Sequence, residues 1–274
     1  MRQAIIAGVA ALAWAGSANA ALTLQVNYAG PAEYASTFAS AAATWQNLLQ
    51  GYQNGLLTVK TQGSSGTVGQ VLSTVVIQAS VFNIDGVGGV LGQAGPTEIA
   101  IDASNFVLAT DGEMSFDTDD VATLASTGGL ADAVLHEMAH VLGLGTLWTS
   151  NGVYANGSGQ YTGVNALTAY RTEFSQPGAA FVPVELGGGQ GTADGHWNEV
   201  DNGAGLTGIT DALGRDLRNE LMTGWLNSPS FISHMTVMSF RDIGFAVPEP
   251  SAMLSVAVIG CVALLGRRGA RSHA

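Results

Sequence analysis

The stretch from Leu135 to Gly143 reads Leu-His-Glu-Met-Ala-His-Val-Leu-Gly and is the strongest constraint on the fold. It continues an apolar helical pattern that begins at Leu130, and Gly143 suits the end of a helix. Histidines four residues apart lie one turn above each other on the same helix face. His136 and His140 can therefore converge on one cation, which in this H-E-x-x-H spacing is expected to be zinc.

Glu137 lies beside the first histidine, offset around the helix, where its carboxylate can activate a water molecule without binding the metal. The five-residue motif also occurs by chance in helices that bind no metal. Here the motif contains two of only five histidines in the chain and stands in an apolar helical pattern. A solvent-exposed helix surface would not explain this combination. We therefore expect a site for metal-assisted hydrolysis with Glu137 as its general base.

Residues 1–20 are typical of an export signal. Arg2 is an early positive charge, an apolar run extends from Ile5 to Ala15, and the small residues Ala18-Asn19-Ala20 follow. An N-terminal membrane anchor is the alternative, but the apolar run is short for one. We expect cleavage after Ala20 and an exported protein.

Residues 248–274 form a second targeting pattern. Pro248-Glu249-Pro250 precedes fifteen apolar or small residues, Ala252 to Gly266, and three arginines between 267 and 271 follow. This run is short for a plain anchor, which needs about 20 residues to span a bilayer. The order resembles a PEP-CTERM sorting signal. The resemblance implies an exosortase-type enzyme as partner, removal of the segment, and a protein that is secreted or on the outer surface of a Gram-negative cell. Membrane contact would be limited to this segment before processing.

The chain between these two segments is strongly acidic. Residues 21 to 248 hold five of the nine basic side chains and twenty of the twenty-one acidic ones. Such a charge balance disfavours binding to nucleic acid and to anionic membranes. The sole cysteine, Cys261, lies in the C-terminal segment, so the acidic body can form no disulfide.

The first half of the body combines one long helical pattern with several strand-like segments. Apolar residues recur every three or four positions from Pro31 to Gln53, which predicts an amphipathic helix that ends near Gly51. Glycine-rich turns are expected at Gly86 to Gly92. The predicted strands are Leu56 to Thr61, Gln70 to Phe82, Thr97 to Asp102 and Glu113 to Asp117. The last of these precedes the H-E-x-x-H helix, where an extended peptide could be held by main-chain hydrogen bonds.

Three acids follow that last strand: Asp117, Asp119 and Asp120. They could bind calcium, but no D-x-D-x-D-G loop is present. Because aspartate is favoured at helix N-termini, capping of the next helical turn is the preferred interpretation.

The second half is rich in loops. Of the 63 residues from Gly152 to Gly214, 14 are glycine, and only Ala166 to Phe174 has helical periodicity there. The segment Arg215 to Met222 closes this part, and an apolar helix from about Ser233 to Ile243 follows. With no internal repeat and no long linker, we expect one catalytic domain, residues 21–247. In it, subdomains 21–148 and 149–247 flank a cleft.

A catalytic zinc ion needs three protein ligands and a position open to water. The short motif that supplies a third histidine six residues after the second is absent, because Thr146 holds that place. The remaining candidates in the body are His196 and His234. His196 is favoured, since its glycine-rich loop can carry it over the cleft, whereas His234 stands at a helix start and can pack beside the cleft wall.

Together these features resemble the leishmanolysin-type branch of the metzincin zinc proteases, across about Gly112 to Val247. The matching residues are His136, Glu137, His140, Gly143, His196-Trp197, Glu220-Leu221-Met222 and Asp242-Ile243-Gly244-Phe245. The resemblance implies an α+β, zincin-like fold. Its N-terminal half would hold a twisted mixed sheet with helices, and its C-terminal half would be loop-rich and mainly helical.

The resemblance also implies roles for individual residues. His136, His140 and His196 would bind zinc, Glu137 would be the general base, and Met222 would form the turn beneath the metal. Gly143 would let the chain turn sharply towards the third ligand.

We therefore expect a zinc endopeptidase that acts on protein or peptide substrates. Residues Ser233 to Met238 are expected to line the pocket for the side chain after the cleaved bond, and their apolar character favours a hydrophobic residue there. The alternative is a non-catalytic surface or matrix protein with a structural zinc site. Glu137 and an open fourth coordination position argue against it, because structural sites usually have four protein ligands.

Overall fold

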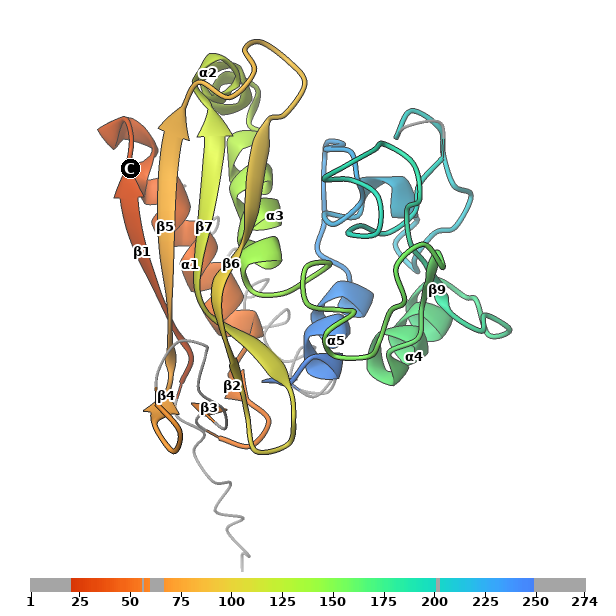
Figure 1. Ribbon diagram of the computed structural model, residues 1–274. Helices are drawn as coiled ribbons and strands as arrows, with labels where there is room; N and C mark the ends of the chain where they lie inside the picture. The colour runs from red at the N-terminus through yellow and green to blue at the C-terminus, as the bar shows by residue number, and fades with distance from the viewer. Residues whose placement is uncertain (1–20, 56, 60–66, 201–202, 249–274) are drawn as a thin grey trace, which may run out of the picture.

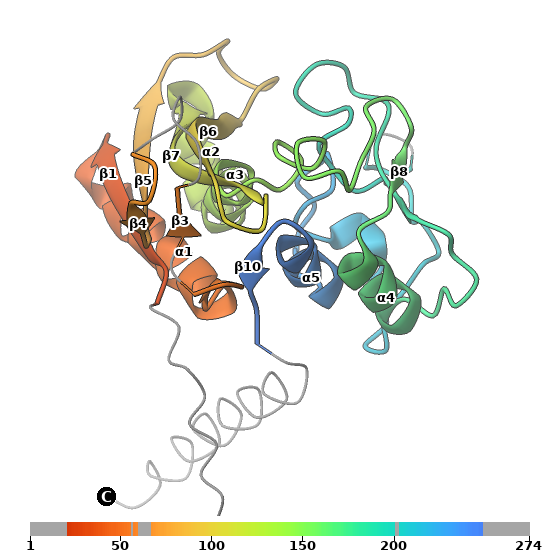
Figure 2. The ribbon, with the colours of Figure 1, turned by 60° about the horizontal axis from the view of Figure 1, so that its bottom comes forward.

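The computed structural model describes residues 21–55, 57–59, 67–200 and 203–248. The predicted export signal and all of the sorting segment except Pro248 lie outside these residues. The described chain is an α+β protein with five α-helices and a twisted mixed sheet (Figures 1 and 2). None of its helices has the length and apolarity that crossing a bilayer requires.

The main sheet has four strands in the order β1-β5-β7-β6. Their bounds are Thr23–Ala29 (β1), Thr74–Phe82 (β5), Val107–Asp117 (β7) and Gly92–Ile101 (β6). The first three are parallel, and β6 runs antiparallel to β7. In β5 the alternate residues Val75, Ile77 and Ala79 are buried, so one face of the sheet packs on the core. The strands near 74–82, 97–101 and 113–117 match predictions, whereas β1 was missed.

Two helices cover the apolar face of this sheet (Figure 1). The 3₁₀ turn η1 (Ala32–Tyr34) leads into α1 (Ala35–Leu48), which packs on β1, and α3 (Leu130–Val141) packs on β6 and β7. Trp45 of α1 donates a hydrogen bond to Leu135 O at 3.0 Å. Gly112 of β7 permits the close approach of α3, because a Cβ there would lie 2.5 Å from a methyl carbon of Val141. The H-E-x-x-H helix is therefore a central packed element.

The helix α2 (Thr118–Thr127) connects β7 to α3, and its start shows how the three acids are used. Asp117 Oδ1 accepts a hydrogen bond from Asp119 N at 2.8 Å, and Oδ2 accepts from the N–H groups of residues 84–86. Burial raises the pKa of Asp117, but these donors outweigh it and lower the pKa to about 2. The predicted capping is confirmed. Within the described chain, the three acids do not form a group of converging metal ligands.

The second half has little regular structure, as its glycine content predicts. α4 (Val164–Glu173) and α5 (His234–Asp242) pack against each other and lie close to their predicted ranges.

The remaining elements of the described chain, in both halves, are a 3₁₀ turn and three short strand pairs. Their bounds are Leu217–Asn219 (η2), Gln160–Tyr161 (β8) with Val182–Pro183 (β9), Leu57–Thr58 (β3) with Val71–Leu72 (β4), and Gly51–Tyr52 (β2) with Phe245–Ala246 (β10).

The pairing of β10 with β2 returns the chain to the first half. Phe245 of β10 is fully buried, and its ring lies 5.4 Å from that of Tyr52 and 5.7 Å from that of Phe240. The two halves thus share one hydrophobic core rather than forming two separate ones.

Candidate metal centre

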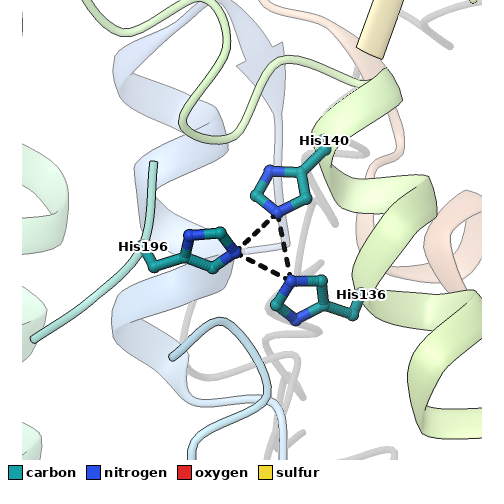
Figure 3. A group of neighbouring side chains, drawn as sticks. All are labelled: His136, His140 and His196. Carbon is teal, nitrogen blue, oxygen red and sulfur yellow. Dashed lines mark hydrogen bonds between the residues drawn. The ribbon is translucent and has the colours of Figure 1, made fainter. Parts of the chain in front are cut away.

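Three histidines from distant parts of the chain meet between the two halves (Figure 3). His136 and His140 lie one turn apart on α3, and His196 comes from the loop after β9. Their Nε2 atoms are separated by 2.9, 3.0 and 3.1 Å. In the described part of the chain, no other group of three histidine, cysteine, aspartate or glutamate side chains converges in this way. The three imidazoles lie close enough to bind one metal ion.

The other nitrogen of each imidazole is held by a backbone carbonyl. The acceptors are Leu221 O for His136 Nδ1 at 2.7 Å, Leu144 O for His140 Nδ1 at 2.8 Å, and Thr192 O for His196 Nδ1 at 2.8 Å. A carbonyl oxygen only accepts, so each Nδ1 carries the proton and each Nε2 presents a lone pair. Three lone pairs that face one another repel unless a cation lies between them. The carbonyls therefore select the tautomer and orientation that bind a metal.

The spacing and protonation of these imidazoles fit zinc. Tetrahedral coordination at 2.0–2.1 Å places neighbouring nitrogen atoms about 3.3 Å apart, so small side-chain rotations open the observed spacing to that value. Burial, assisted by the neighbouring His140, lowers the pKa of His136 to about 3. Burial and the two neighbouring imidazoles hold the pKa of His196 well below its usual value. Burial also lowers the pKa of His140, so all three imidazoles are neutral at pH 7, as metal coordination would require.

His196 reaches α3 because the next residue anchors its loop. Trp197 is fully buried, and its ring stacks on Trp148 with centroids 4.7 Å apart. Its indole Nε1 donates to Thr236 Oγ1 at 2.8 Å, and its backbone N donates to Met222 O at 2.9 Å. An aromatic residue directly after His196 thus fixes the position of this histidine.

Two glycines after α3 let the chain turn back towards that loop. Gly143 has φ 111° and Gly145 has φ 74°, backbone conformations that favour glycine. A Cβ on Gly145 would lie 2.3 Å from Gly195 O, directly before the third histidine. Sequence reasoning identified Gly143 but missed Gly145, although the Gly-Leu-Gly spacing after the motif is a signal for it.

The segment Glu220-Leu221-Met222, here called the Met222 turn, contacts both elements that carry the three histidines. Leu221 O accepts from His136, and Met222 O accepts from the chain after His196. The carboxylate of Glu220 anchors the turn to the start of α5. It accepts hydrogen bonds from Met222 N at 2.6 Å, Ser233 N at 3.0 Å, Ser233 Oγ at 2.8 Å and Thr236 Oγ1 at 2.6 Å. Burial raises the pKa of this carboxyl. Met222 itself is fully buried.

A cleft of about 1260 Å³ contains the three histidines. One wall is formed by residues 89–94, which include the start of β6, and the opposite wall by residues 188, 190–196 and 224–227. Glu137 also lines the cleft, and a Cβ on Gly92 would lie 3.2 Å from its carboxyl carbon. Burial raises the pKa of Glu137 to about 8. Glu137 is thus next to the histidines without belonging to the converging group.

Two expectations about the cleft walls are wrong. The strand that precedes α2 and α3, β7, is paired with β5 on one side and β6 on the other, so it has no edge for a peptide. The edge beside the cleft belongs to β6. Residues 233–238 do not line the cleft, because the hydroxyl groups of Ser233 and Thr236 are buried in hydrogen bonds to Glu220.

His234, the rival third ligand, lies apart from the histidine group. It begins α5, and its backbone N donates to Glu173 Oε1 of α4 at 3.0 Å. Its Nε2 is buried without a hydrogen-bond partner among the described residues. His234 is therefore part of the contact between α4 and α5.

No model of a known protein family matches this chain, and no curated protein matches it. The chemistry of the site is therefore inferred from its geometry.

Proposed function

We propose that this protein is a zinc-dependent endopeptidase with a zincin fold of the metzincin type. The observation that carries the proposal is the convergence of three neutral imidazoles in a large cleft with Glu137 beside them. Three protein ligands leave one position for water, as in catalytic zinc sites. The positive φ at Gly143 and the contact of the Met222 turn with His136 agree with the resemblance to leishmanolysin-type proteases.

The metal and the protein side chains would contribute different parts of the reaction. When bound, zinc supplies Lewis-acid polarisation of the substrate carbonyl and lowers the pKa of water towards ~7. Glu137 takes a proton from the attacking water and delivers it to the leaving amine nitrogen. The carbonyls of residues 144, 192 and 221 keep the three imidazoles in one orientation throughout.

The edge of β6 supports a peptide as the substrate. In the described chain β6 pairs only with β7, and its first residues, 92–94, line the cleft. An extended peptide can add to such an edge through main-chain hydrogen bonds. Gly92 lies against Glu137, so a peptide bond held there would lie beside both the general base and the histidines.

The test measures zinc content and peptide hydrolysis on the same preparation. We expect the zinc-loaded protein to cleave a peptide library and a chelator to stop it. Glu137→Ala should keep its zinc but lose about 10²–10⁴ in kcat/KM, because only the general base is removed. Hydrolysis retained in this variant at unchanged zinc content would refute the role of Glu137. A zinc-loaded wild type without hydrolysis would instead favour the surface protein with a structural zinc site.

Export and sorting are proposed from the terminal sequence patterns alone, residues 1–20 and 248–274. We propose a protein carried outside a Gram-negative cell and processed there by an exosortase-type enzyme.

A further inference from the structure

Among the described residues, the one guanidinium group that lines the cleft is that of Arg218. The described carboxylate side chains that line it are Glu137 and Asp194. Asp194 is already engaged, since it accepts hydrogen bonds from Tyr154 and from Gly157 N. In the described part of the cleft, then, Arg218 has no free acid to neutralise it, although the chain holds acids in large excess over bases.

Arg218 is held in place by a neutral side chain. Its Nε and Nη2 donate to Asn227 Oδ1 at 3.3 and 3.2 Å, and Asn227 Nδ2 donates back to Arg218 O at 3.0 Å. Arg215, three residues earlier, differs: it pairs with Asp211 at 2.7 Å. No carboxylate in the described chain forms an ion pair with Arg218. Its guanidinium is therefore held in place and retains N–H donors for a partner in the cleft.

The position of Arg218 along the cleft follows from its neighbours. Leu226, on the same wall, lies near Gly129 at the start of α3, where a Cβ would be 3.7 Å from a Leu226 methyl carbon. Further along β6, Gly95 lies near Thr146, beyond the end of α3. The wall with Arg218 is thus at the end of the cleft where β6 begins. A peptide antiparallel to β6 would have its C-terminal part at this end.

We propose that Arg218, positioned by Asn227, binds a carboxylate of the substrate on the C-terminal side of the cleaved bond. This inference rests on the proposed peptidase function and adds a substrate class: peptides with an acidic side chain or a free chain end at that place. A guanidinium fork matches a carboxylate with parallel hydrogen bonds. Trp225, 41% exposed on the same wall, offers an apolar surface for the methylene groups of an acidic side chain.

The experiment compares four peptides that differ only in their carboxylates. A glutamate or a glutamine stands at a chosen position after the cleaved bond, and each peptide has either a free or an amidated C-terminus. In successive sets of peptides, the glutamate or glutamine is placed one residue further from the cleaved bond. The zinc-loaded proteins are the wild type, Arg218→Gln, Arg218→Glu and the control Arg171→Gln. The control removes the same charge from α4, outside the cleft, where Arg171 donates to Ala179 O.

At one position the wild type should prefer the peptide with the carboxylate by about 10- to 100-fold in kcat/KM, the range for a hydrogen bond to a charged group. Arg218→Gln should lose this preference, Arg218→Glu should reverse it, and Arg171→Gln should retain it. General damage to the fold would lower the rates for all four peptides alike. A preference that follows the free C-terminus rather than glutamate identifies the chain end as the bound group.

Affinity measured without turnover separates the two proposals. The dissociation constants of the same peptides are measured by calorimetry with zinc-loaded Glu137→Ala, alone and combined with Arg218→Gln. If the wild type hydrolyses nothing while an Arg218-dependent preference of tenfold or more persists in Kd, the peptidase proposal fails and the carboxylate site stands. If peptides are hydrolysed but carboxylate and amide peptides have equal kcat/KM and Kd values, only the carboxylate site is refuted and the peptidase proposal stands. A preference that survives Arg218→Gln refutes it as well.

Discussion

At the scale of single residues, backbone carbonyls control the chemistry of the three imidazoles. Each Nδ1 proton is fixed by a main-chain oxygen that exists whatever side chain stands at positions 144, 192 and 221. The tautomer therefore depends on the path of the backbone, and substitutions of those side chains that preserve the path should leave the ligands correctly oriented.

Replacing single histidines tests which of them bind the metal. His196→Ala should lower zinc affinity by well over the 10–100-fold that loss of an outer hydrogen-bond partner costs, because it removes a ligand itself. His234→Ala should keep one zinc per chain, since its ring lies outside the converging group. Zinc per chain after dialysis and a competition titration with a chromophoric chelator measure both. If His234→Ala lost its zinc while His196→Ala retained it, His234 and not His196 would be the third zinc ligand.

The convergence of the three histidines was predictable because few residue types can bind zinc and the chain has few histidines. Arg218 was not predictable as part of the cleft, since five basic side chains in the body look alike in sequence. Only the fold distinguishes Arg215, which an acid neutralises, from Arg218, which faces the cleft. The carbonyl acceptors were beyond sequence reasoning for a simpler reason: every residue carries one.

At the scale of elements, the Met222 turn depends on one buried carboxylate. Glu220 collects four hydrogen bonds from the turn and from the start of α5. Leu221 O and Met222 O in turn contact both elements that carry the three histidines. Glu220 therefore helps to position these histidines without lining the cleft itself.

Glu220→Gln should destabilise the fold by about 1–3 kcal/mol. The amide can still accept from Ser233 and Thr236, but its NH₂ group then faces Met222 N, so a buried donor loses its acceptor. Thermal unfolding should show a drop of about 2–4 °C for each kcal/mol. The control is Glu98→Gln, an exposed glutamate on β6, which should unfold like the wild type. Equal melting temperatures for the two variants would contradict the anchoring role.

Helices were easier to predict than strands. The apolar periodicity of the sequence located α1, α3, α4 and α5. Each of these helices packs on the core through the apolar face that its own sequence pattern indicates. β1 was missed although Leu24, Val26 and Tyr28 alternate with polar residues, the usual strand signal. β6 begins at Gly92, within a run interpreted as turns, because its ladder with β7 imposes the extended conformation on a glycine-rich segment. Strand order is set by long-range pairing, which no local pattern encodes.

At the scale of the whole molecule, the proposed metal site connects the two halves of the chain. α3 belongs to the first half and supplies two of the three histidines, whereas the loop with His196 belongs to the second. Binding of an ion there would therefore contribute to the stability of the complete fold.

Removing the metal should lower the melting temperature. Zinc at a thousand times its dissociation constant stabilises the folded state by about 4 kcal/mol, which corresponds to roughly 8–16 °C for a domain of this size. Differential scanning calorimetry with and without a chelator measures the shift. Glu137→Ala should show the same shift as the wild type and His196→Ala much less. A full shift in His196→Ala would mean that the ion does not depend on the second half.

The pairing of β10 with β2 has a consequence for a molecule whose backbone is cut. A cut in one of the glycine-rich loops between residues 152 and 195 would leave His136, His140 and β2 in one fragment and His196 and β10 in the other. With the proposed ion bound, the two fragments would remain joined at two separate places, the three histidines and this strand pair.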